Sequence, residues 1–173
     1  MNAATEGKVG ISERIMHADG AGGRVVIFRV KPGFDVIEAV RQVCTHYGIS
    51  AGVITALFGS FKRVKLGIPY EGLRFPIPPE EPGVKIVKEN VLVGSGSGLV
   101  STLEDGEIEI HLHVMLYDGG LSDMPAVGGH VLTNEPVPAH GTVEVAIQEV
   151  TGVKLVRRLD DEVGESVTFP EKP

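Results

Sequence analysis

Several residue types are scarce in this chain, and each scarcity removes a class of protein. Tryptophan is absent and Cys44 is the only cysteine among 173 residues, so an internal disulfide and a zinc cluster built on thiolates are excluded. Cys44 lies in a helical pattern and is expected to be a small core residue. No apolar run approaches the roughly 18 residues of a membrane span, and no signal-peptide pattern opens the chain. We therefore expect a cytoplasmic protein.

Positive charge is also in short supply. Sixteen Lys and Arg stand against 23 Asp and Glu, which gives a formal net charge of −7. Binding to nucleic acid draws its affinity from contacts between basic side chains and phosphates. The basic residues form only two loose groups, Lys62-Arg63-Lys65 and Lys154-Arg157-Arg158, both expected on solvated strand faces. Direct binding of nucleic acid is therefore not expected.

The chain is rich instead in turn residues and short β-prone segments. It contains 23 Gly and 11 Pro, which separate apolar, β-branched stretches typical of short strands. The stretch from Val36 to Tyr47 follows the 3.6-residue helical period, with Asp35 as N-cap and Gly48 as the stop signal. One main helix, short helical pieces and about eight strands, without βαβ alternation, predict an α+β fold with a mainly antiparallel sheet.

The sequence predicts one domain with a peripheral segment at each end. Residues 1–23 end in a glycine-rich run and are expected to form a flexible lead-in. Residues 24–159 form the domain, and residues 160–173 form an acidic tail.

Within the domain, two strand pairs and one long loop are expected. Ser50–Phe58 and Gly59–Gly67 are predicted to form a hairpin, and Lys85–Val93 and Ser95–Leu103 a second strand pair. The glycines between Gly94 and Gly98 open no helix, so they indicate a bulge or a close backbone approach and not a phosphate loop. The proline-rich segment 68–83 is expected to be a functional flap or a packing arm.

The chemistry of the chain concentrates between Glu107 and Leu132. His111 and His113 lie in a β-prone apolar run, where residues i and i+2 leave one face of a strand about 6.5–7 Å apart. Such a pair is either hydrogen-bonded and partly buried or shares one metal ion. His130 follows Gly128-Gly129, which allows a close approach of the chain. Three neutral imidazoles without a fourth protein ligand favour an open metal site over a closed structural one.

Five pieces of the chain follow the order of a known family. They are Gly33-Phe-Asp-Val-Ile-Glu-Ala-Val40, Ile49-Ser-Ala-Gly-Val-Ile54 with Gly59-Ser60, His111-Leu-His113, Gly128-Gly-His-Val-Leu132 and Thr142-Val-Glu-Val145. Together they resemble the plant and prokaryote conserved (PPC) family, whose domain stands alone in bacteria and follows AT-hooks in plants. The resemblance implies a bacterial stand-alone member that forms a homotrimer. It also implies that His111, His113 and His130 bind a metal, usually zinc, near a subunit interface.

Two points limit what the resemblance implies. The chain has no Arg-Gly-Arg-Pro core of an AT-hook, so the DNA-binding label of many bacterial relatives has no motif behind it here. The cupin barrel also uses His-x-His and a later His, and Pro125–His130 is similar to its second motif. However, the cupin pattern has a Glu soon after the His pair, where this chain has Asp118, and the early helix fits the PPC family better.

Three functions therefore stay open: a metal-dependent enzyme acting on a small anionic molecule, a ligand-sensing or scaffold trimer with a structural metal, and a DNA-binding or regulatory protein. Glu144 is the candidate catalytic residue, because its charge interrupts a β pattern. It is expected to orient a ligand histidine, act as general base or pair with an arginine across the trimer, unless it simply faces solvent. Arg14, Arg24 and Lys85 are candidate contacts for the anionic molecule.

Overall fold

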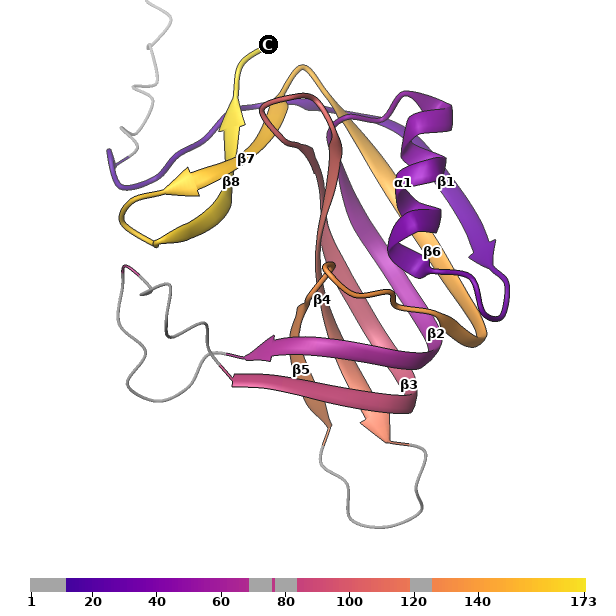
Figure 1. The fold of residues 1–173 in the computed structure, drawn as a ribbon. Coiled ribbons are helices and arrows are strands. Elements are labelled where there is room, and N and C mark those ends of the chain that lie inside the picture. The colour runs from indigo at the N-terminus through magenta and orange to yellow at the C-terminus, as the bar shows by residue number, and fades with distance from the viewer. Residues whose placement is uncertain (1–11, 69–75, 77–83, 119–125) are drawn as a thin grey trace, which may run out of the picture.

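The computed structural model describes residues 12–68, 76, 84–118 and 126–173 (Figure 1). In these ranges the chain forms β1 (Ala21–Val30), α1 (Val36–Tyr47), β2 (Gly52–Ile68), β3 (Val84–Thr102), β4 (Ile108–Asp118), β5 (Val127–Val131), β6 (Ala139–Thr151), β7 (Lys154–Asp160) and β8 (Glu165–Glu171). The predicted α+β fold with one main helix is confirmed. The expected short helical pieces do not occur in the described ranges.

All eight strands belong to one strongly bent sheet. Its order is β1-β6-β2-β5-β4-β3-β7-β8, with β2 and β3 paired in addition. Neighbouring strands are antiparallel, apart from a single parallel pair between β3 and β7, Thr102 with Val156. Because β2 contacts both β3 and β5, the strands β2, β5, β4 and β3 form a closed circuit of hydrogen-bonded neighbours. In Figure 1 the outer parts of β2 and β3 bend and run across the lower part of the view.

The expected hairpin within residues 50–67 is wrong, because β2 runs through it without a turn. Within β2, Gly59 has a φ of 138°, and the register with β6 shifts just after it, between Gly59 and Phe61. A Cβ at this position would lie 2.1 Å from the carbonyl oxygen of Thr142 on β6. A residue without a side chain therefore lets β2 approach β6 closely here, and the ladder between the two strands continues on both sides of Gly59.

The second expected strand pair, within residues 85–103, is also wrong, since β3 is continuous. The glycine-rich stretch inside it nevertheless behaves as predicted. The register with β4 shifts between Val93 and Ser95, as in a bulge. A Cβ on Gly98 would lie 2.0 Å from the carbonyl oxygen of His111, so the backbones of β3 and β4 approach as closely as glycine permits.

Helix α1 follows its local sequence signals and carries part of the core. The Asp35 carboxylate accepts a hydrogen bond of 2.8 Å from the backbone of Glu38, and Gly48 ends the helix with a φ of 68°. The buried face of α1 includes Val40 and Cys44, both fully buried. The burial of Cys44 confirms that it is a core residue, and the same burial raises the pKa of its thiol to about 11. No helix of the described residues has the length and apolar character of a membrane span.

The expected acidic tail is not a tail in the structure. Residues 160–173 contain β8, which pairs with β7 along its whole length. The acidic residues around the strand hide its β pattern in the sequence, and a basic partner offsets one of them. Arg158 pairs with Glu171 at 2.5 Å, and its guanidinium lies 4.1 Å from the centre of the Phe169 ring.

The other two peripheral predictions concern segments that the structure describes in part. Residues 1–11 of the expected lead-in lie outside the described residues, while Ala21 to Gly23 already belong to β1. The expected flap or packing arm lies outside them too, except for its two described positions, Ile68 and Pro76.

Candidate metal centre

The centre is built on β4, whose alternate residues face opposite sides of the sheet. Ile110, Leu112 and Val114 are 0–3% exposed and face the core. His111 and His113 therefore leave the opposite face. The strand period thus places two imidazoles side by side, as the sequence predicts.

The register of the neighbouring strands completes the site. His113 pairs with Ser97 on β3 and with His130 on β5, and His130 pairs with Gly67 on β2. Residues directly opposite one another in antiparallel strands share a face, so these four residues form one row across four strands. A hollow of about 420 Å³ lies at His113 and His130, and its lining also includes Ser95, Ser97 and Gly128.

The three histidines meet at distances suitable for a shared ion. The Nε2 atoms of His111 and His113 are 3.1 Å apart. The ring centres of His111 and His130 are 4.7 Å apart, and one ring nitrogen from each of the three residues lies within 4.8 Å of the others. Two nitrogens bound to tetrahedral zinc at about 2.0–2.1 Å are separated by about 3.3 Å. The geometry of the pair therefore fits joint coordination.

The electrostatics of the site favour the neutral form of His111 and His130, the form that binds a metal. Burial, then the nearby Arg157 guanidinium and the other two rings, lowers the pKa of His111 to about 4. Burial and then His113 lower the pKa of His130 to about 4 as well. The Nδ1 atom of His130 is buried and has no hydrogen-bond partner among the described residues. A buried polar nitrogen without a partner is costly, and a metal ion would satisfy it.

Arg157 is the site residue that the sequence reasoning missed. Its Nη1 atom lies 2.8 Å from Nδ1 of His111. The expectation that it lies on a solvated strand face is wrong, because β7 is half-buried here and runs beside β3. No local pattern announces this contact, since the single parallel pair between β3 and β7 joins distant parts of the chain.

The structure does not bring the catalytic candidate Glu144 to the histidines. Glu144 is half-buried on β6, in register with Arg29 of β1 and Phe58 of β2. It belongs neither to the group of three histidines nor to the lining of the hollow. Its catalytic role stays a prediction.

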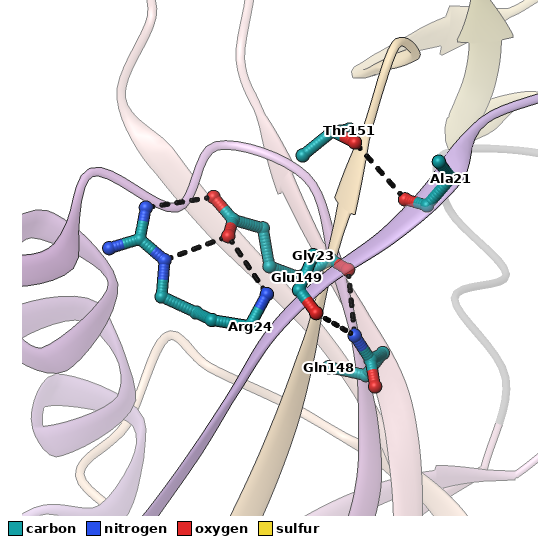
Figure 2. Close-up of polar contacts among 6 residues, drawn as sticks. All are labelled: Ala21, Gly23, Arg24, Gln148, Glu149 and Thr151. Carbon is teal, nitrogen blue, oxygen red and sulfur yellow. Dashed lines mark hydrogen bonds and ion pairs between the residues drawn. The ribbon is translucent and has the colours of Figure 1, made fainter.

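The candidate anion contacts fall into two kinds. Arg24 is engaged within the chain, because its Nε and Nη2 atoms donate to Glu149 at 2.8 and 3.2 Å (Figure 2). Arg14 pairs with Glu162 at 3.0 Å. Lys85, by contrast, pairs in register with Gly67, which is itself opposite His130. Lys85 therefore extends the row of the site, and its side chain is exposed.

Comparison with known sequences identifies the family. The sequence profile of the Plants and Prokaryotes Conserved domain, which is the PPC domain, matches residues 17–151. The chain belongs to the PPC family. The matched residues include all three histidines and end before β7, so Arg157 is supplied from outside the matched part. No curated protein matches the chain.

Solved structures share the PPC fold along most of their length. A PPC protein from Pyrococcus horikoshii has 24% identity and a TM-score of 0.71, with 92% of this chain and 100% of that chain covered. A metal-containing protein from Archaeoglobus fulgidus has 21% identity and a TM-score of 0.67, with 90% and 98% covered. A Ralstonia eutropha protein that is named as a candidate DNA-binding protein has 19% identity and a TM-score of 0.65. The match covers 82% of this chain and 88% of that chain.

Proposed function

We propose that this PPC-family protein holds one divalent metal ion per chain with His111, His113 and His130 and presents it to a small anionic molecule. The observation that carries the proposal is the convergence of three imidazoles, one of which has a buried nitrogen without a partner in the described residues. Structural zinc sites use four protein ligands, whereas three leave a coordination position open.

The donor set points to zinc as the first candidate ion. Imidazole ligands suit zinc, copper, iron and nickel, while carboxylate ligands would favour magnesium, calcium or manganese. No carboxylate belongs to the ligand group among the described residues. The name of the Archaeoglobus fulgidus relative, a metal-containing protein, supports a metal without naming it.

The surroundings favour an anion at the open position. The hydroxyl-bearing residues Ser95 and Ser97 line the hollow, Arg157 contacts His111 and Lys85 extends the row. A zinc ion in such a site polarises a carbonyl or lowers the pKa of bound water to about 7. Turnover of the bound molecule would make the protein an enzyme, and binding without turnover would make it a ligand sensor.

Metal analysis tests the proposal directly. Protein saturated with zinc and dialysed should contain close to one ion per chain by elemental analysis. His113→Ala should lose it, because two of three ligands do not hold the ion against dialysis. His140→Ala is the matched control, since His140 is an exposed histidine on β6, and should keep the ion. Full metal content in His113→Ala would contradict the proposal.

We also propose that the protein assembles as a homotrimer through the histidine-bearing face of its sheet. That face leaves Ile27 76% exposed, Phe58 47% exposed and Met115 40% exposed, and a partner subunit would cover them. Light scattering at micromolar concentration should give three times the 18.4 kDa of one chain. A monomer mass would count against the trimer.

Direct binding of DNA is not part of the proposal, although the name of the Ralstonia eutropha relative raises it. A net charge of −7 per chain repels duplex phosphates. A labelled AT-rich duplex should therefore show no saturable binding at about 150 mM salt. Binding tighter than about 1 µM would exceed the usual non-specific range and would favour DNA binding instead.

A further inference from the structure

Arg157 has different surroundings from five other arginines of the described residues. Each of those five pairs with a carboxylate at 2.5–3.3 Å, and they are Arg14, Arg24, Arg41, Arg63 and Arg158. In the part of the chain that the structure describes, no carboxylate lies within ion-pair distance of Arg157, whose hydrogen-bond partner is the imidazole of His111. The carboxylates of Glu109 and Glu165 act on Arg157 electrostatically from beyond that distance. A half-buried guanidinium without a directly paired carboxylate is costly, so its position favours an anion.

The chemistry of arginine fixes the direction of the hydrogen bonds at the site. A guanidinium only donates, so Nδ1 of His111 accepts from Arg157 at 2.8 Å. The neutral His111 ring then carries its proton on Nε2. This atom lies 3.1 Å from Nε2 of His113 and donates to it. Arg157, His111 and His113 therefore form one directed chain of hydrogen bonds.

This chain cannot persist when His111 acts as a metal ligand. Coordination through Nε2 needs the lone pair of that atom, which moves the ring proton to Nδ1, where it would face the N–H group of Arg157. Coordination through Nδ1 needs the atom that Arg157 occupies. In either case Arg157 gives up its contact with His111. Its planar set of donors, whose geometry matches carboxylate and phosphate groups, then becomes available beside the site.

We propose that Arg157 is the specificity-determining residue of the site and that it selects a ligand carrying an oxyanion, either a carboxylate or a phosphate group. This inference rests on the proposed function and narrows the small anionic molecule to an oxyanion. The site itself must supply positive charge, from the metal ion and from Arg157, because the chain as a whole, at −7, repels anions. The contact comes from the C-terminal hairpin, outside residues 17–151 that the family profile matches.

The test measures metal and oxyanion binding separately on the full chain loaded with cobalt(II), whose visible spectrum reports the coordination of the ion. Acetate and inorganic phosphate are titrated in separate arms, and the tighter of the two identifies the group that is recognised. Wild-type protein is compared with Arg157→Met, which keeps the length of the side chain but removes its charge. Arg158→Gln is the matched control, because Arg158 is the next residue on β7 and contacts Glu171 and Phe169.

Arg157→Met should bind cobalt as fully as wild type, because it removes a donor that opposes coordination. Its affinity for the preferred oxyanion should fall at least about tenfold, as expected when a charge-assisted hydrogen bond is lost. Arg158→Gln should change neither quantity. Compared with Arg157→Met, Arg157→Lys should restore part of the phosphate affinity and less of the acetate affinity. The reason is that the lysine ammonium group carries the charge but cannot form the two parallel hydrogen bonds of a guanidinium. This variant also decides the matter if Arg157→Met does not fold.

Unchanged oxyanion affinity in Arg157→Met would overturn the inference while leaving the metal site intact. Loss of cobalt from Arg157→Met alone would also overturn it, since Arg157 would then support the metal site itself. Failure of wild-type protein to take up cobalt would refute the proposed function, and the inference with it.

Discussion

Side chains along β4 point alternately to two faces of the sheet, and the two faces serve different purposes. On one face Ile110, Leu112 and Leu116 are at most 1% exposed, and close packing dictates their size and shape. The other face carries His111 and His113, followed by Met115 and Tyr117, which are 40% and 46% exposed. Packing does not require imidazoles there. The comparison teaches that a change on one face should cost stability, while a change on the other should cost binding.

The largest expected difference is between Leu112→Ala and His113→Ala in protein treated with a chelator. Leu112 is fully buried, so its truncation should lower the free energy of unfolding by about 2–5 kcal/mol through the lost burial and the cavity. His113 is exposed, so its truncation should change the same quantity by less than about 0.5 kcal/mol. Urea titration followed by circular dichroism measures both. Equal losses in the two variants would show that the histidine face is also a packing face.

Two glycines sharpen the comparison at a smaller scale. An added Cβ on Gly98, on the core face, would meet a backbone oxygen at 2.0 Å, whereas one on Gly128, on the histidine face, would meet the Sδ atom of Met115 at 2.5 Å. A strand backbone cannot move aside, so Gly98→Ala should cost about 1–3 kcal/mol. The exposed Met115 side chain can rotate away, so Gly128→Ala should cost less than about 1 kcal/mol. A smaller loss in Gly98→Ala than in Gly128→Ala would contradict this reasoning.

The smallest expected effect is the dependence of stability on pH in chelator-treated protein. The pKa values of His111 and His130 are about 4 in the folded chain, below the ordinary value of 6.5. Between these values the unfolded chain binds more protons, so the free energy of unfolding falls as pH decreases through this window. Allowing for solvent screening of half-buried rings, we expect a loss on the order of 1 kcal/mol from pH 7 to pH 5.5.

The matched variant for this pH effect carries both His111→Gln and His130→Gln. Its free energy of unfolding should change less over the same pH range, because the two titrating rings are gone. An equally steep decline in this variant would assign the effect to other groups.

Local signals made parts of the molecule predictable from the sequence. The helix carries its own caps, Asp35 and Gly48, and the strand period alone puts His111 and His113 on one face. The third ligand, His130, was assigned with the help of the family resemblance, because its approach depends on how β5 pairs with β4.

The errors share one physical cause, which is that the deciding contact lies far away in the chain. Gly59 resembles a turn residue until β6 is seen to pair on both sides of it. Arg157 resembles a solvated strand residue until β7 is placed beside β3. The strand Glu165–Glu171 resembles a tail because acidic residues surround its short apolar alternation of Val167 and Phe169, and its pairing with β7 is not visible in the sequence. The spacing of residues along the sequence does not show which distant strands pair with one another.

The closed circuit of β2, β5, β4 and β3 has a consequence for the order of events during folding. Two strand pairs of this circuit join distant parts of the chain. They are β2 with β5, as in Leu66 with Val131, and β2 with β3, as in Gly52 with Val100. Sheets that depend on such long-range pairs fold slowly, on the order of milliseconds to seconds, because the chain loses the entropy of loop closure before the stabilising contacts form. His130 reaches His113 only when β5 joins β4. The ability to capture a metal ion therefore arises with the closure of the sheet, so rapid-mixing capture of cobalt would time that closure.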